Sequence, residues 1–216
     1  MKKMLAAFFI ILLVGCSGTR EAYKSYIEFT YPSISSPDTT FKRPVIFFTR
    51  PVDRRTGIPE NYIGRFQDRS VELYTKDKLE DIIGVFLSKL IKSHGNQSIF
   101  IHRKDLEEKA SNGVILETVI NDFQISMRFS HGGFYPITKL KYDGKGTADI
   151  EILLLNGNSG KTVWMKTISA IVHYKKRGFS HREQHAAFQE VLDNIFRQVM
   201  QKIDEEIPWD KLEQQT

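Results

Sequence analysis

Cysteine is almost absent from this chain of 216 residues, which contains one, and proline is sparse, with seven. A single cysteine leaves no internal disulfide to form and excludes metal or iron–sulfur sites built from several cysteines. A large excess of one charge is also missing, because 31 basic residues face 26 acidic ones, for a formal charge of +5. Such a small excess does not indicate a nucleic-acid-binding protein. The 41% hydrophobic share is enough to bury a substantial core, and the length predicts one or two domains.

The one cysteine follows an organised N-terminus. Lys2 and Lys3 give a positive start, and residues 4–14 form an uninterrupted apolar run. This run is too short for the roughly 20 residues that a membrane-spanning helix needs. Its length instead matches the hydrophobic part of a secretory signal, which spans about 7–15 residues.

The run ends in a tetrapeptide that resembles the bacterial lipobox, Leu13-Val14-Gly15-Cys16. This resemblance implies that Leu13, Val14 and Gly15 form the recognition site of a signal peptidase. It also implies that Cys16 accepts diacylglycerol on its thiol and an N-acyl chain on its amino group. Several acyl chains hold a protein stably at a membrane, whereas one chain alone holds it weakly. The alternative is an ordinary cleaved signal in which the cysteine has no role.

Cleavage before Cys16 predicts three parts of the chain. Residues 1–15 are the signal peptide, residues 16–40 a flexible tether with room for one edge strand, and residues 41–216 a single periplasmic domain. Removal of the first 15 of the 216 residues leaves 201, and the loss of Lys2 and Lys3 lowers the formal charge from +5 to +3. Ser17 stands where an aspartate commonly retains such proteins in the inner membrane, which favours the periplasmic face of the outer membrane. Because the periplasm has no ATP or NAD pool, nucleotide-dependent catalysis is not expected.

Hydrophobic periodicity predicts the elements of the domain. Residues 44–49 are of strand length and composition, residues 50–70 read as loop, and residues 76–92 have the spacing of an amphipathic helix. Thr75 is the expected N-cap of this helix and Gly95 lies just past its end. The apolar stripe of the helix comprises Leu79, Ile82, Ile83, Phe86, Leu90 and Ile91.

The second half predicts further strands and a long final helix. Short alternation indicates a strand over 98–102, a helical turn is expected over 105–110, and residues 114–129 end in clean alternation. Residues 146–155 and 162–174 predict a hairpin around the turn at 156–160. Ser180 and Glu183 have the spacing of a helix capping box. The apolar stripe behind it runs to Pro208 and comprises Phe188, Val191, Leu192, Ile195, Val199, Ile203 and Ile207.

These elements predict an α+β fold. We expect a two-layer sandwich in which a mostly antiparallel sheet of four to five strands is covered on one face by two long amphipathic helices.

Three patterns that imitate functional motifs are better explained by local structure. Gly160-Lys161-Thr162 echoes a phosphate-binding loop, but the required first glycine is Leu155, and a strand follows instead of a helix. His181 and His185 are four residues apart, but the residues between them match no zinc motif, and no third ligand is in register. No G-x-S-x-G sequence supports a serine hydrolase. We therefore expect no metal site, no cofactor beyond the acyl chains on Cys16, and no enzymatic activity.

Two segments are candidates for contact with a partner or with lipid. The basic run Lys175, Lys176 and Arg177 is expected where the last strand turns into the last helix, and it would meet lipid phosphates or an acidic partner. Its alternative is a solvated turn. The connection over 130–145 is long and holds Phe134 and Tyr135, which favours either a docking loop or a merely flexible one.

The order of these elements resembles the small periplasmic lipoproteins of the YajG and ABC-transport-auxiliary types. The resemblance rests on the lipobox, the tether, the segment LETVINDFQISMRF, the hairpin ADIEILLLNGNSGKTVWMKT and the long C-terminal helix. It implies a sheet-and-two-helix fold similar to that of the lipopolysaccharide-assembly lipoprotein. That branch usually shows a Gly-Phe-x-Leu-Arg stretch soon after the cysteine, and SGTREAYKSY stands here instead.

The expected function is that of a lipid-anchored accessory protein in a bacterial envelope complex for transport, secretion or surface assembly. It would act by tethering and protein contact, because confinement to a membrane raises the effective concentration of partners there. The alternatives are a module that binds lipid or glycan and, less favoured, a periplasmic hydrolase. Neither nucleic acid nor nucleotide is an expected partner.

Overall fold

A computed structural model describes residues 23–29, 45–66, 71–106, 113–132, 139–179 and 183–212. This part of the chain contains nine strands, two long helices, a short C-terminal helix and a 3₁₀ turn at Arg103–Asp105. The strands are β1 (Tyr23–Ile27), β2 (Val45–Phe48), β3 (Val52–Asp53), β4 (Tyr62–Phe66), β5 (Val71–Thr75), β6 (Gln97–Phe100), β7 (Val114–Gly132), β8 (Lys139–Asn156) and β9 (Thr162–Phe179). The helices are α2 (Leu79–Ser93), α4 (Gln184–Glu206) and α5 (Trp209–Leu212).

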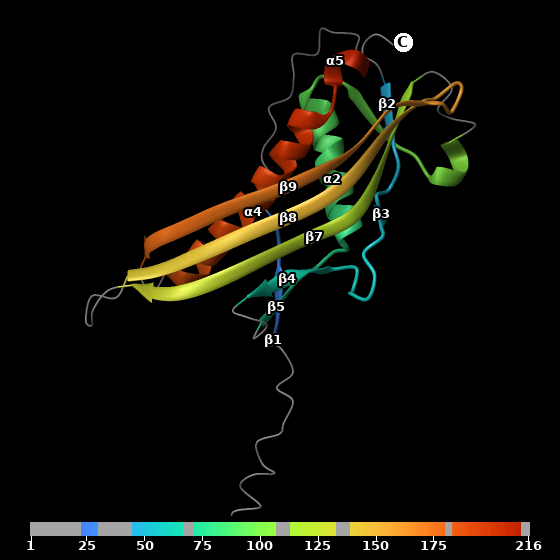
Figure 1. The fold of residues 1–216 in the computed structure, drawn as a ribbon. Coiled ribbons are helices and arrows are strands. Elements are labelled where there is room, and N and C mark those ends of the chain that lie inside the picture. The colour runs from blue at the N-terminus through green and yellow to red at the C-terminus, as the bar shows by residue number, and fades with distance from the viewer. Residues whose placement is uncertain are drawn as a thin grey trace, which may run out of the picture.

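A long antiparallel ribbon of β7, β8 and β9 forms the body of the sheet (Figure 1). With 18 or 19 residues in each strand and about 3.3 Å per residue, the ribbon is roughly 60 Å long. The free edge of β7 pairs in succession with β2, β3 and β4, all parallel to it. Strand β6 extends the sheet from β2, and β5 and β1 extend it from β4. Two small groups of strands, which we call the two small sheets, therefore extend the sheet from different parts of β7: β2 with β6, and β4 with β5 and β1.

The expected two-layer sandwich with a four- to five-stranded sheet is wrong. The sheet is a curled half-barrel of nine strands, and five of the eight strand pairings in the described residues are parallel. The segment expected to be loop, 50–70, contains β3 and β4. The two residues of β3 are too few to show alternation, and Gly64 interrupts the pattern of β4. Both strands form because the long edge of β7 supplies their hydrogen-bond partners.

The two long helices lie on the same face of the sheet (Figure 1). The rings of Phe86 in α2 and Phe196 in α4 are 5.8 Å apart between centroids, inside one core that also contains the inward side chains of the sheet. The predicted apolar stripe of α2 is buried throughout, and that of α4 is buried except for Phe188, which is partly buried against the same core. Both amphipathic segments are thus confirmed as core helices.

The predicted helix caps are less accurate than the helices. Helix α2 begins at Leu79 with Lys78 at the N-cap, while the Thr75 hydroxyl lies 2.6 Å from the carbonyl oxygen of Asp77. Gly95 follows α2 with a φ of 77°, as its place past the helix end predicts. Helix α4 has Glu183 at the N-cap and not in the first turn, and Ser180 lies outside the described residues.

The strands predicted from alternation are confirmed, and three of them are longer than expected. Strand β7 extends to Gly132, and β8 already begins at Lys139. Most of the expected long connection over 130–145 is therefore sheet. The turn at 156–160 is a hairpin turn in which the Asn156 side-chain oxygen accepts hydrogen bonds from two backbone amides. Gly160 has a φ of 63°, and β9 follows it, so the phosphate-loop resemblance is excluded by the structure.

Strand β1 lies inside the segment expected to be the tether. It pairs in parallel with β5 from Tyr23↔Val71 to Ile27↔Thr75, and Ile27 and Phe29 are buried in the core. The sheet therefore begins at residue 23, while residues 1–22 lie outside the described part. Among the described helices, none combines the length and apolar character that would let it cross a membrane.

Candidate functional site

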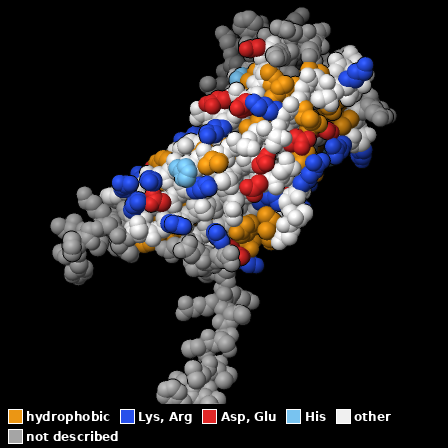
Figure 2. Space-filling model, viewed as in Figure 1, with side chains coloured by type: hydrophobic (Ala, Val, Ile, Leu, Met, Phe, Trp, Pro, Cys, Tyr) orange, Lys and Arg blue, Asp and Glu red, His pale blue; other side chains and the backbone are white. Residues whose placement is uncertain are grey.

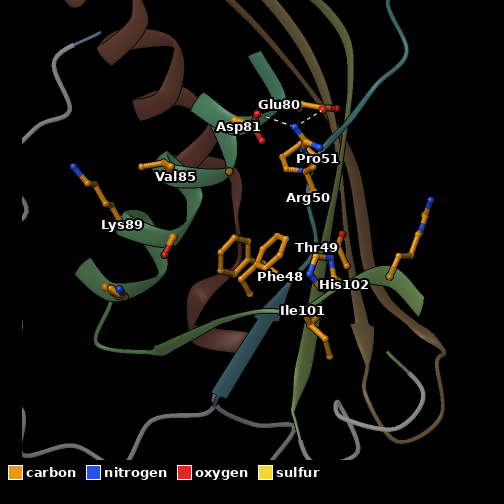
Figure 3. Close-up of a pocket in the computed structure, with 15 residues that line it drawn as sticks. Phe48, Thr49, Arg50, Pro51, Glu80, Asp81, Val85, Lys89, Ile101 and His102 are labelled. Atoms are coloured by element: carbon orange, nitrogen blue, oxygen red, sulfur yellow. Dashed lines mark hydrogen bonds and ion pairs between the residues drawn. The ribbon is translucent and has the colours of Figure 1, made fainter. Parts of the chain in front are cut away.

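A groove of 760 Å³ lies between α2 and the carboxyl ends of β2 and β6 (Figure 3). One wall is the solvent-facing side of α2, and the other is the chain that leaves β2 and β6. This placement follows from the topology, because α2 connects β5 to β6 and crosses from one small sheet to the other. Ligand sites in sheets with parallel strands favour the carboxyl ends of those strands.

A glycine in α2 lets the chain after β2 approach the helix. A Cβ atom on Gly84 would lie 3.4 Å from the Cδ atom of Pro51, so the proline ring packs directly on the helix backbone. Both residues line the groove. The sequence pattern correctly placed Gly84 in a helix and Pro51 outside it, but it did not predict their contact.

Arg50, which follows β2, forms ion pairs with two acids of α2 across the groove. Its guanidinium lies 2.9 Å from Glu80 Oε1 and donates a 2.7 Å hydrogen bond to Asp81 Oδ2, as the dashed lines in Figure 3 show. The hydrogen bond to Asp81 is the main reason that the pKa of Arg50 is raised. Partial burial raises the pKa of Glu80, and the charge of Arg50 opposes that shift. Both acids that line the groove are thus engaged by one cation.

Aromatic and aliphatic side chains form the rest of the groove. Phe100 is 48% exposed and Val85 is 45% exposed, although both are large apolar residues. The Phe100 ring lies 5.5 Å from the Phe48 ring and 5.2 Å from the His102 ring, both edge to face. Exposed apolar side chains that gather in a concave site mark a surface for a protein or ligand. None of these groove residues was a sequence candidate, since Phe48 and Phe100 read only as strand residues.

The groove holds little chemistry that would point to a reaction. Ser88 and Ser98 share a hydrogen bond of 3.0 Å between their hydroxyl oxygens. In the described ranges no group of three His, Cys, Asp or Glu side chains is arranged to hold a metal ion. His94, one of the scattered histidines, lies 2.8 Å from Asp204 of α4 and stacks on Trp209. His181 and the side chain of His185 lie outside the described residues.

The basic run is expected in the turn between the last strand and the last helix. It lies instead within β9. Lys175, Lys176 and Arg177 pair with residues 143, 142 and 141 of β8. Because strand residues alternate between faces, Lys176 points to the helix side, where it lies 2.8 Å from Glu190 of α4. Lys175 and Arg177 are exposed on the opposite face. The run therefore supplies two cations to the outer surface and one to a helix contact.

The other candidates lie outside the described residues. They are Leu13, Val14, Gly15 and Cys16 of the lipobox, and Phe134 and Tyr135 in the connection between β7 and β8. Their predicted roles stay predictions.

Comparisons with known proteins identify structural relatives only. No family model and no curated protein matches the chain. A Helicobacter pylori protein named as a homologue of the neuraminyllactose-binding hemagglutinin is 12% identical with a TM-score of 0.47, covering 89% of this chain and 100% of its own. A Xanthomonas campestris protein of the DUF330 family is 10% identical with a TM-score of 0.48, covering 89% and 99%. Rare lipoprotein B from Shewanella oneidensis is 12% identical with a TM-score of 0.31, covering 66% and 92%.

Bacterial lipoproteins are thus among the solved structures that this chain resembles. All three TM-scores are below 0.5, so the proposals below depend on the residues of this chain.

Proposed function

We propose that this protein is a lipid-anchored accessory protein of a bacterial cell-envelope complex, held at the periplasmic face of the outer membrane and acting by protein contact without catalysis. The observation that carries the proposal is the short interval between Cys16 and the folded sheet. Tyr23, the first residue of β1, is only seven residues beyond the cysteine of the lipobox-like sequence. An acylated Cys16 would hold the whole domain at the membrane surface.

The tether sets how far the domain can move from the membrane. Seven residues span at most about 25 Å when fully extended. A domain confined in this way meets membrane-bound partners at high effective concentration, so a small interface can be occupied. The groove between α2, β2 and β6 is the surface best suited to such a partner, because it exposes Phe100 and Val85 beside charged side chains.

The anchor is tested by replacing its thiol. We expect Cys16→Ser to abolish labelling with radioactive palmitate and to prevent formation of the mature, membrane-bound protein. Serine has no thiol to accept the diacylglyceryl group and form the thioether bond. Ser17→Ala serves as the matched control and should label like the wild type. Palmitate label on the Cys16→Ser protein would contradict the anchor.

The groove is tested by site-specific photocrosslinking in intact cells. A crosslinking residue at Phe100 or Val85 should capture one defined envelope protein, and the capture should disappear in the Cys16→Ser background. A crosslinking residue at Ile171, which is 56% exposed on the opposite face of the sheet, is the control. Capture of the same protein from Ile171 would show that the groove is not the contact surface.

A second candidate is a module that binds a lipid or glycan, which the exposed rings of Phe100 and His102, packed on the buried ring of Phe48, favour. Native mass spectrometry of the purified protein distinguishes the two. A bound small molecule that is lost in Val85→Trp, in which the larger ring fills the groove, would favour this candidate over a protein partner.

A further inference from the structure

The outer face of the ribbon separates its charges along its length. Five lysine and arginine side chains and one histidine gather toward one end of β7, β8 and β9, and we call this surface the basic end: Arg128, Lys141, Lys145, His173, Lys175 and Arg177. They face away from the helices, because the alternate residues Gly144, Gly146 and Val172 are buried against α4 or the core. Figure 2 shows lysine and arginine side chains grouped over the left half of the ribbon.

The cations of the basic end outnumber the acids beside them. Asp143 lies among them, with Lys141 Nζ at 2.6 Å and Lys175 Nζ at 3.7 Å from its carboxylate. Partial burial would raise the pKa of Asp143, but Lys141, Lys175 and Arg177 outweigh it and lower that pKa. In the part of the chain that the structure describes, Lys145 and Arg177 form no ion pair. The basic end therefore keeps a net positive surface.

The adjoining stretch of the same face is acidic. Asp122 and Asp149 stand opposite each other in the β7–β8 pairing, and Glu151 pairs with Val119 two residues further along. An anionic surface that attracts the basic end would repel this stretch. The two charges together favour one tilt of the ribbon over the others.

The register of the sheet brings the basic end level with the point where the chain enters it. Tyr23 pairs with Val71, Val71 with Phe66, and Phe66 with Met127. Met127 in turn pairs with Gly144, and Gly144 with Tyr174. These six residues form one row across six strands, and the basic end lies on both sides of this row. At about 4.8 Å between strands, β8 is roughly 20 Å from β1, which is within the reach of a seven-residue tether.

We propose that the basic end docks on the anionic phospholipid headgroups of the membrane that holds Cys16. The inference rests on the proposed lipid anchor and deepens it, since a tether alone limits distance and leaves orientation free. Charge complementarity and the short tether select the membrane surface as the occupant. The groove lies at the other end of the sheet, where Phe48 pairs with Leu116. Leu116 is eleven residues before Met127 in β7, or about 36 Å along it, so docking directs the groove away from the membrane.

Depth-dependent quenching tests this orientation in the intact protein. Because Cys16 is the only cysteine and is acylated in the mature protein, an introduced cysteine is a unique site for a fluorescent label. Ser130→Cys places the label on an exposed position beside the basic end, and Asn158→Cys places it on the exposed hairpin turn at the far end. The acylated proteins are reconstituted in vesicles of phosphatidylethanolamine and phosphatidylglycerol that carry a nitroxide headgroup lipid, or in phosphatidylcholine vesicles with the same nitroxide.

We expect the label at residue 130 to be quenched in the anionic vesicles at 0.1 M salt, and the label at residue 158 to remain unquenched. Quenching should disappear at about 1 M salt, where the screening length falls to roughly 3 Å. Each cation near an anionic surface contributes roughly fivefold to binding, so Lys145→Glu with Arg177→Glu should lower the ratio of docked to undocked protein by about 25-fold or more. The matched control, Lys104→Glu with Lys161→Glu, makes the same change in net charge at exposed positions outside the basic end and should dock normally.

The outcomes separate the two proposals. Failure of the protein to float with vesicles would overturn the anchor and, with it, the docking. Flotation with no quenching at residue 130, equal quenching in neutral vesicles, or equal quenching in the Lys145→Glu, Arg177→Glu protein would overturn the docking alone.

Discussion

A buried ion pair organises the least regular part of the sheet. The side chain of Arg55 is 3% exposed and that of Asp53 is 8% exposed, with 2.7 Å between their closest atoms. The guanidinium also donates to the carbonyl oxygens of Tyr62 at 2.7 Å and Phe123 at 3.2 Å. One side chain thus joins β3, β4 and β7 beside the register shift between Ile120 and Asp122. In the sequence it is one arginine among several charges.

Removal of this arginine should destabilise the fold strongly. Arg55→Ala leaves the Asp53 carboxylate buried without its cation, and we expect the free energy of unfolding to fall by about 3–5 kcal/mol. Urea denaturation of the two proteins measures the difference. Arg54→Ala is the control, because Arg54 is exposed and should cost no more than about 0.5 kcal/mol. Equal effects of the two substitutions would contradict this role.

The Lys176–Glu190 contact predicts a small acid-dependent loss of stability. The hydrogen bond from Lys176 lowers the pKa of Glu190 below its ordinary value of 4.5, against a smaller opposing effect of burial. A lowered pKa in the folded state contributes stability that is present above pH 4.5 and is lost as the pH falls through the folded value.

Both side chains of this pair are more than one third exposed, so the contribution should be below about 1 kcal/mol. Denaturation midpoints between acid and neutral pH check it. Glu190→Gln should show a smaller decrease on the acid side than the wild type, and an identical decrease would exclude the contribution.

At the scale of elements, two glycines in β8 determine how α4 packs on the ribbon. A Cβ atom on Gly144 would lie 2.4 Å from the Cδ1 atom of Ile195, and one on Gly146 would lie 2.3 Å from its Cγ2 atom. Real Cβ atoms do not approach other atoms so closely. Because these glycines have no side chain, α4 packs directly against the backbone of β8, where any larger residue would push it away. The alternation in the sequence begins this strand at Gly146 and leaves Gly144 in the connection over 130–145, so it misses the first part of β8.

A methyl group at one of these glycines should disturb the helix contact. We expect Gly146→Ala to lower the free energy of unfolding by about 1–3 kcal/mol through overpacking. Ile195→Ala removes the clashing atom, so the double variant should be more stable than the sum of the two single effects predicts. Additive effects in chemical denaturation would show that the cost of Gly146→Ala does not come from contact with Ile195.

At the scale of the whole molecule, the basic end and the groove lie toward opposite ends of the ribbon formed by β7, β8 and β9. This arrangement predicts that docking depends on tether length. Insertion of about 20 Gly and Ser residues between Arg20 and Glu21 lengthens the tether and lowers the effective concentration of the basic end at the membrane. Palmitate labelling and urea stability should be unchanged, while quenching at residue 130 should decrease. Unchanged quenching would mean that the basic end binds the membrane without help from the anchor.

Local patterns of sequence determined the long elements, and a local pattern also predicts the lipid anchor. The period of Leu79, Ile82, Ile83 and Phe86 predicts α2, and the alternation over 122–129 predicts the middle of β7. The lipobox resemblance at Cys16 predicts the anchor for the same reason, because it depends on adjacent residues alone. These patterns can be recognised without knowledge of the fold, because each depends only on residues that are close together in the sequence.

Only the tertiary structure decided the shape of the sheet and the position of both candidate surfaces. Strands β3 and β4 exist because β7 pairs with them, and the groove exists because Pro51 meets Gly84 and Phe100 meets Phe48 from distant parts of the chain. The basic end likewise combines residues 128 to 177 through strand register. Parallel pairing joins segments separated by long stretches of sequence, and its free energy comes from partners that no local window contains.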